Sequence, residues 1–156
     1  MDRSLAAFVA LAAAATLGSA LAFQHWGGLA PCELCYWQRY PYWGAIPLAT
    51  LGAVLRGRAA ALCVAGAAVC LAATAGIGAF HVGVELKWWQ GTGACGSTLG
   101  PAATLEELRA RLLAAPIVRC DSPAWTLFGL SMAAYNMLIA TGLAALAGFA
   151  AWKSAR

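Results

Sequence analysis

Charged side chains are scarce in this sequence: Asp, Glu, Lys and Arg make up 10% of its 156 residues. Soluble domains usually carry about 25% charged residues, so that class is excluded first. The 10 basic residues give a formal net charge of +4, but they are spread thinly along the chain. They never form the basic stripe that follows a phosphate backbone, and we therefore expect no nucleic acid partner. Internal repeats and low-complexity tracts are also lacking.

Hydrophobic residues make up 62% of the sequence, and many of them lie in long apolar runs. Such composition predicts an all-α membrane protein, a four-helix transmembrane bundle that occupies residues 1–156 as a single domain. The first run also resembles a secretory signal with a small-residue cleavage site, although we expect it to be retained as a helix. The expected spans are approximately 5–23, 36–55, 59–80 and 125–151.

The second span contains a charged side chain, Arg39, near its start. Its uninterrupted apolar run, 42–55, would form only about 21 Å of helix, whereas a bilayer core is about 30 Å thick. The helix must therefore begin earlier, near Cys35, and this places Arg39 about one turn inside it. A guanidinium at that depth requires an anion, water or a polar ligand.

Basic residues at the ends of the spans indicate the orientation. The loops 24–35 and 81–124 are separated by two crossings, so both must face the same, outer side of the membrane. Both termini and the short turn after the second span are then expected to be cytoplasmic. The basic residues at these cytoplasmic ends are Arg3, Arg56, Arg58, Lys153 and Arg156.

The second outer loop contains a predicted amphipathic helix. Thr104 and Glu107 have capping-box spacing, and Leu105, Leu108 and Leu112 share one helical face. We expect a short helix on the membrane surface that ends before a proline. A small packed helix within a folded loop is the alternative.

Two of the six cysteines are interpreted as structural. Cys63 and Cys70 lie in the third span among Val, Ala, Leu and Gly, without a polar neighbour in sequence. A thiol in such surroundings keeps its proton and behaves as a small hydrophobe.

The other four cysteines face outward and can carry chemistry. Cys32 and Cys35 form a C-x-x-C at the start of a helix, where the helix dipole stabilises a thiolate. Cys95 lies in the Gly-rich segment 91–100, and a bridge from it to Cys120 would close a mobile loop of about two dozen residues. An accessible disulfide of this kind can be attacked by a thiolate of another protein.

Two other interpretations of these four cysteines stay open at this point. They could bind one zinc ion as a Cys₄ site, although such sites usually offer two closely spaced ligand pairs and this chain offers one. They could instead form purely structural disulfides, although the small ring closed by a C-x-x-C constrains little of the chain. We expect redox activity and no metal.

Four motifs follow one another along the chain: PCELCYWQR at 31–39, HVGVE at 81–85, Cys120-Asp121, and WTLFGLS at 125–131. In sequence and in order they resemble the bacterial DsbB family of quinone-dependent, disulfide-generating membrane proteins. The resemblance covers nearly the whole chain.

The resemblance implies a membrane thiol:quinone oxidoreductase of the bacterial inner membrane, with its cysteine loops in the periplasm. A reduced periplasmic oxidase of the DsbA type would attack a Cys95–Cys120 bridge, and electrons would pass through Cys32–Cys35 to ubiquinone or menaquinone. By position, Cys35 matches the family cysteine that meets the quinone.

The resemblance also assigns Arg39 to quinone support, and His81 could donate a hydrogen bond or a proton nearby. A binding or assembly protein with structural disulfides is the rival class. A relative of the vitamin K epoxide reductases is disfavoured, because their C-x-x-C lies in a late helix.

Overall fold

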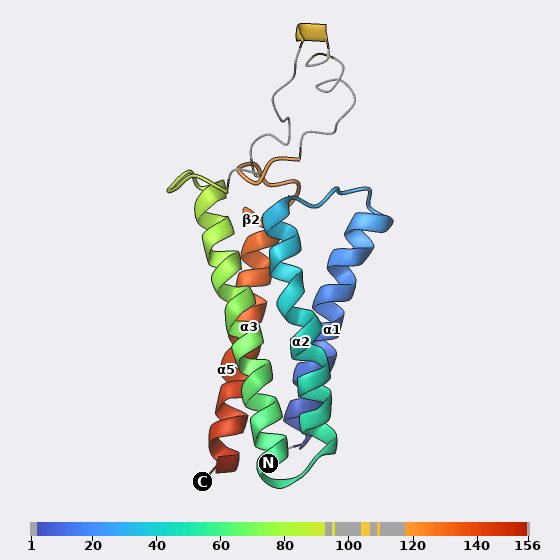
Figure 1. Ribbon diagram of the computed structural model, residues 1–156, viewed down its shortest axis with the longest axis vertical. Coiled ribbons are helices and arrows are strands. Elements are labelled where there is room, and N and C mark those ends of the chain that lie inside the picture. The colour runs from blue at the N-terminus through green and yellow to red at the C-terminus, as the bar shows by residue number, and fades with distance from the viewer. Residues whose placement is uncertain (1–2, 93–94, 96–103, 107–108, 110–117, 156) are drawn as a thin grey trace.

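Four helices run side by side in the computed structural model, which describes residues 3–92, 95, 104–106, 109 and 118–155 (Figure 1). The α3 helix makes its most extensive contacts with α5 and α2, and α1 packs mainly against α2. The helices are α1 (Arg3–His25), α2 (Glu33–Val54), α3 (Gly57–Glu85) and α5 (Met132–Ala155).

Small side chains form much of the contact between the helices. Where Ala and Gly face a neighbouring helix, backbones can approach closely, as in membrane bundles. Gly52 of α2 illustrates this, since a Cβ there would lie 2.4 Å from a methyl carbon of Val64 in α3. Fully buried alanines come from all four helices: Ala13, Ala45, Ala67 and Ala147.

Large apolar side chains lie on the outside of the bundle. Leu11, Leu62 and Val69 are each about 70% exposed, although each lies within a long helix. Three of the described helices are long and apolar enough to cross a membrane: Arg3–His25, Gly57–Glu85 and Met132–Ser154. The α2 helix is not among them, because polar residues such as Gln38 and Arg39 lower its mean hydropathy. Length and composition therefore support three spans.

The predicted start of the last span is wrong. The α5 helix begins at Met132, and the preceding residues form an antiparallel hairpin of β1 (Thr126–Leu127) and β2 (Leu130–Ser131). Phe128 and Gly129 at its tip have φ of 51° and 78°, the positive values that two-residue hairpin turns require. The hairpin is as apolar as a helix end, so hydropathy could not separate the two.

The second helix begins earlier than expected, at Glu33, because Cys32 is its N-cap and accepts a hydrogen bond from the Cys35 backbone N–H. The predicted spans 5–23 and 59–80 fall inside α1 and α3. The amphipathic helix predicted over 104–112 lies largely outside the described residues.

Both termini and the α2–α3 connection lie at one end of the bundle (Figure 1). There the Arg3 guanidinium of α1 donates hydrogen bonds to the carbonyls of Ala53, at 2.8 Å, and Val54, at 3.3 Å. The first turn of α1 is thus attached to the last turn of α2. The C-x-x-C and the β hairpin lie at the opposite end.

Candidate redox site

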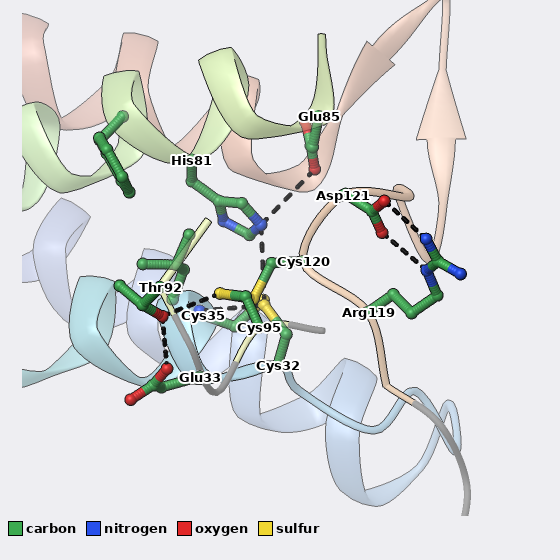
Figure 2. Close-up of a disulfide and its surroundings, with 12 residues drawn as sticks. Cys32, Glu33, Cys35, His81, Glu85, Thr92, Cys95, Arg119, Cys120 and Asp121 are labelled. Atoms are coloured by element: carbon green, nitrogen blue, oxygen red, sulfur yellow. Dashed lines mark hydrogen bonds and ion pairs between the residues drawn. A yellow bond between two sulfur atoms is a disulfide. The ribbon is translucent and has the colours of Figure 1, made fainter. Parts of the chain in front are cut away.

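Four cysteines meet beside the first turn of α2: Cys32, Cys35, Cys95 and Cys120 (Figure 2). Cys95 and Cys120 form a disulfide, and Cys32 and Cys35 are free thiols whose sulfurs lie 2.8 Å apart. Cys32, Cys95 and Cys120 are buried in one cluster, and Cys35 packs against it. The two segments that carry the cysteine pairs, far apart in sequence, therefore meet in space.

The start of α2 gives the two free thiols different surroundings. The Cys35 backbone N–H donates to the Cys32 sulfur at 3.3 Å. The side-chain hydrogen bond with Cys35, and burial after it, raise the pKa of Cys32 above its ordinary value. The two sulfurs share one hydrogen bond, in which either thiol can be the donor.

The outer disulfide is covered rather than exposed. Cys95 and Cys120 retain only 4% and 1% of their accessible surface, which corrects the expectation of an accessible bridge. Backbone hydrogen bonds explain the burial, because the Cys120 N–H donates to the Cys95 carbonyl and the Cys95 N–H to that of Thr92. The Thr92 hydroxyl in turn donates to Glu33 of α2 at 2.6 Å. The segment around the bridge is thus held against the head of α2.

An ion-pair cluster fixes the other side of this segment. The Asp121 carboxylate accepts hydrogen bonds from Lys87, at 2.6 Å, and from Arg119, at 2.7 and 2.8 Å. Arg119, and Lys87 with it, hold the pKa of the Asp121 carboxyl well below its usual range. Lys87 follows α3 directly, so the cluster attaches the residue after Cys120 to the outer end of that helix.

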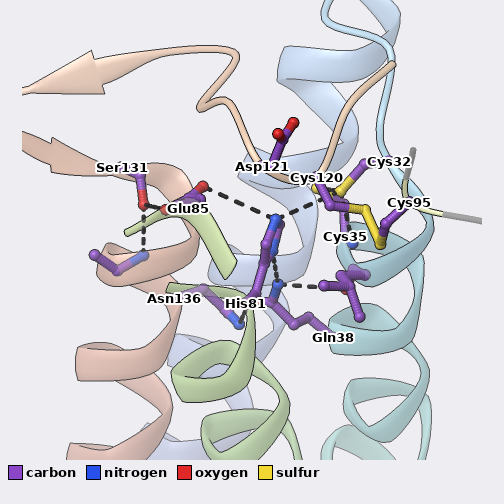
Figure 3. Close-up of polar contacts among 12 residues, drawn as sticks. Cys32, Cys35, Gln38, His81, Glu85, Cys95, Cys120, Asp121, Ser131 and Asn136 are labelled. Atoms are coloured by element: carbon purple, nitrogen blue, oxygen red, sulfur yellow. Dashed lines mark hydrogen bonds and ion pairs between the residues drawn. A yellow bond between two sulfur atoms is a disulfide. The ribbon is translucent and has the colours of Figure 1, made fainter. Parts of the chain in front are cut away.

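His81 of α3 contacts the inner pair (Figure 3). Its side chain is buried, and Nε2 lies 3.6 Å from the Cys32 sulfur. Nε2 also lies 3.9 Å from the carboxylate of Glu85, which accepts a hydrogen bond from the Ser131 hydroxyl. On the other side of the ring, Nδ1 is 2.7 Å from Nε2 of Gln38.

Gln38 belongs to a polar chain that the sequence analysis did not identify. The side-chain oxygen Oε1 of Gln38 accepts a hydrogen bond from Nδ2 of Asn136 in α5 at 2.7 Å. Oδ1 of Asn136 accepts one from the Tyr42 hydroxyl at 2.8 Å. Gln38 is 5% exposed, so these partners are needed to satisfy its amide. The only sequence signal was a polar residue one helical turn after Cys35 in an apolar span.

A cavity of about 290 Å³ opens between α1, α2 and α5, and Cys35 and Arg39 are among its lining residues. The Arg39 guanidinium donates to the side chain of Gln24 and to the carbonyl of Ala20, and it lies 5.5 Å from the ring centre of Tyr36. Arg39 is therefore partnered by neutral oxygens, the kind of polar ligand that its depth in the helix requires. His81 does not line this cavity. Much of the lining is apolar, including Leu17, Phe23, Leu29, Trp125, Leu127 and Ile139.

The two remaining cysteines lie in α3 and take no part in this cluster. Both are half-buried. Cys70 packs close to Gly44 of α2, where a Cβ would lie 3.2 Å from its sulfur.

A helical bundle with an apolar exterior, a buried disulfide packed on a dithiol, and a cavity that reaches one of the thiols defines a class: membrane thiol–disulfide proteins. Comparison with known proteins identifies the family. The family model described as "Disulfide bond formation protein DsbB" matches residues 2–150. The chain therefore belongs to the DsbB family and is a multi-pass membrane protein of disulfide bond formation.

Two relatives carry the name "Disulfide bond formation protein B". They come from Xanthomonas euvesicatoria pv. vesicatoria (strain 85-10) and Xanthomonas axonopodis pv. citri (strain 306), and each is 34% identical over 94% of this chain and 88% of its own length. No solved structure shows significant similarity to the chain.

Proposed function

We propose that this protein is a thiol:quinone oxidoreductase that reoxidises a DsbA-type periplasmic dithiol oxidase. In this proposal Cys95 and Cys120 exchange with the soluble partner, and Cys32 and Cys35 pass the electrons to a membrane quinone. Membership of the DsbB family supports the disulfide chemistry. The identities of the soluble partner and of the electron acceptor go beyond family membership and are part of the proposal.

The observation that carries the proposal is the cavity that contains both Cys35 and Arg39 in its lining. Its largely apolar wall suits a hydrophobic ring, and its volume of about 290 Å³ is close to the lower limit for small-molecule sites. A quinone bound there would supply an acceptor for two electrons and two protons. Arg39 would hold a quinone oxygen, because its present partners are neutral and leave its charge uncompensated.

A second hollow lies beside the outer disulfide and supports its assignment to the partner protein. About 540 Å³ in volume, it is lined by Cys95 and by the aromatic side chains Trp88 and Trp89, with Asp121 at its border. Aromatic residues are enriched at protein interfaces. Because Cys95, rather than Cys120, lines the hollow, we propose that Cys95 receives the partner's thiolate.

The exchange balances in two steps. The partner loses two thiols and gains a disulfide, while the Cys95–Cys120 bond is broken and two thiols form. These thiols then reduce a Cys32–Cys35 disulfide and restore the outer bridge. In the structure the outer pair is bridged and the inner pair is free, which is the distribution expected after the second step.

The proposed topology adds α2 as a fourth span in the bacterial inner membrane. The α1–α2 connection lies at the same end of the bundle as the described residues that follow α3 and precede α5, so both outer loops would face the periplasm and both termini would be cytoplasmic. Arg56 and Arg58 lie at the other end and agree with the positive-inside rule.

Turnover measurements on the reconstituted protein test the function. The reduced partner and a short-chain ubiquinone or menaquinone analogue are added, and partner thiols and quinone absorbance are followed together. We expect thiol loss only when quinone is present, no turnover by Cys35→Ser, and a partner-linked mixed disulfide on Cys120→Ala. Cys63→Ser, a matched substitution outside the site, is expected to retain activity. Full activity of Cys35→Ser would overturn the proposal and favour structural disulfides.

A further inference from the structure

A continuous line of hydrogen-bonding groups leads from the cavity wall through Gln38 and His81 to the inner thiols (Figure 3). The Tyr42 hydroxyl bonds to Oδ1 of Asn136, and Nδ2 of Asn136 donates to Oε1 of Gln38. Nε2 of Gln38 then faces Nδ1 of His81 at 2.7 Å. The line crosses from α5 to α2 to α3, so it connects three helices at the level of the site.

The direction of this line depends on which way the Gln38 amide points. Nε2 of Gln38 also lies 3.3 Å from the backbone carbonyl of Leu34. A backbone carbonyl can only accept, so the group that faces it must be the NH₂ end of the amide. The opposite end, Oε1, accepts from Asn136. The Gln38 backbone is fixed as well, since its carbonyl accepts a hydrogen bond from the Thr74 hydroxyl.

This orientation determines the histidine tautomer. If the Gln38 NH₂ group donates to Nδ1 of His81, then Nδ1 carries no proton and the neutral ring must carry it on Nε2. Nε2 is the nitrogen that lies 3.6 Å from the Cys32 sulfur. His81 can therefore donate to Cys32, and the contact between the Cys32 and Cys35 sulfurs, 2.8 Å apart, continues the line to Cys35.

We propose, on the basis of the function proposed above, that Gln38 is a positioning residue that fixes His81 as the Nε2–H tautomer. Every donor from the Tyr42 hydroxyl to the His81 ring then points toward the inner thiols, of which Cys35 lines the cavity. Asn136 and Leu34 act through Gln38, because they hold its amide in the required orientation.

The same tautomer has a second consequence, which concerns metal ions. The ligand atoms of Cys32, Cys35 and His81 lie within 4.8 Å of one another, a set that could hold zinc when both thiols are reduced. A zinc-binding histidine needs a bare nitrogen toward the metal and usually donates its other N–H to a carboxylate or carbonyl. With Gln38 as the donor, the nitrogen facing the cysteines is protonated. Gln38 thus protects the reduced dithiol from metal capture.

Nitrogen-15 NMR of the His81 ring tests the proposal on the reduced protein in detergent, without quinone or partner. The chain has only 2 histidines, so His25→Asn leaves His81 as the sole signal. We expect a protonated Nε2 and a bare Nδ1. In Gln38→Glu the carboxylate can only accept, so a proton must appear on Nδ1. Gln90→Glu, the same change at an exposed position, is the matched control and is expected to leave the ring unchanged.

Zinc affinity provides a second readout. Competition with a chromophoric chelator should show that Gln38→Glu binds Zn²⁺ about 10- to 100-fold more tightly than the parent protein, the usual effect of an outer-shell partner. The gain should disappear when Cys32→Ser is added.

A proton on Nδ1 of the parent protein, or an unchanged His81 spectrum in Gln38→Glu, would overturn the proposal. Both results are independent of turnover. If the protein instead fails to oxidise a partner with quinone while the tautomer is as expected, then the proposed function fails and the role of Gln38 stands.

Discussion

Replacing Arg39 with Gln should weaken binding of the electron acceptor more than it slows thiol exchange. Arg39 is the one charged side chain among the described residues that line the cavity. Its hydrogen-bond partners there, Gln24 and the Ala20 carbonyl, are neutral, so its charge is free to act on a quinone oxygen. A hydrogen bond with a charged donor contributes about 1.5–3 kcal/mol. Since each 1.4 kcal/mol is tenfold, the KM for quinone should rise about 10- to 100-fold.

Steady-state kinetics with a soluble quinone analogue measure this effect. The quinone is varied at a saturating concentration of the reduced partner, and the formation of the mixed disulfide is followed separately. Arg39→Lys keeps the charge but loses the planar fork, so its KM should lie between those of the parent and Arg39→Gln. Arg56→Gln removes a charge at the N-cap of α3, next to the α2–α3 connection at the opposite end of the bundle, and should leave the KM unchanged.

An unchanged KM for Arg39→Gln would refute the assignment of Arg39 to the acceptor site. A loss of mixed-disulfide formation would also refute it, because that step uses the outer bridge, which Arg39 does not touch. If instead Arg39→Lys were as impaired as Arg39→Gln, the geometry of the fork rather than the charge would be the essential property.

Two further perturbations test how the site is held together. Because the pKa of Asp121 is lowered, its ion pairs contribute stability above the ordinary carboxyl value of about 4, and this contribution is lost as the pH falls through the lowered value. At neutral pH a phosphine should therefore reduce the outer bridge of the parent more slowly than that of Asp121→Ala, and this difference should shrink in acid. Equal reduction rates of the two proteins at every pH would contradict this role. Separately, Gly52→Ala should destabilise the protein by about 1–3 kcal/mol, because its new methyl would overlap Val64. Thermal unfolding in detergent would measure the loss, and Val64→Ala added to Gly52→Ala should restore part of it; equal stability of Gly52→Ala and the parent would show that the helices can separate freely.

The bundle could be predicted from the sequence where hydropathy is decisive. Apolar runs located α1 and α3 to within a few residues at most ends. An uncharged apolar run of about 20 residues indicates a transmembrane helix and few other structures. The start of α5 was missed for a physical reason: a tight hairpin around Phe128 and Gly129 satisfies its own backbone hydrogen bonds and can therefore be as apolar as a helix.

The contacts that orient the hydrogen bonds of the site could not be predicted from the sequence. Counting membrane crossings predicts that the two cysteine loops lie on one side of the membrane. It does not predict how each helix is rotated about its axis. Whether Gln38 meets Asn136, which is 98 residues away, depends on the rotation of α2 and α5 about their axes. Hydropathy gives little information on that rotation, since both helices are apolar on most faces.

The buried amides of Gln38 and Asn136 are the part of the bundle that composition alone would least favour. A polar side chain among apolar helices is tolerated when each of its donors and acceptors is satisfied, and here each amide bonds to the next. A lipid-facing exterior supplies little preference for one helix rotation over another. This series of hydrogen bonds forms in only one rotation of each helix. The same contacts therefore set the register of α2, α3 and α5 and direct hydrogen bonds toward the inner thiols. Loss of one member should disturb the thiols before it unfolds the helices.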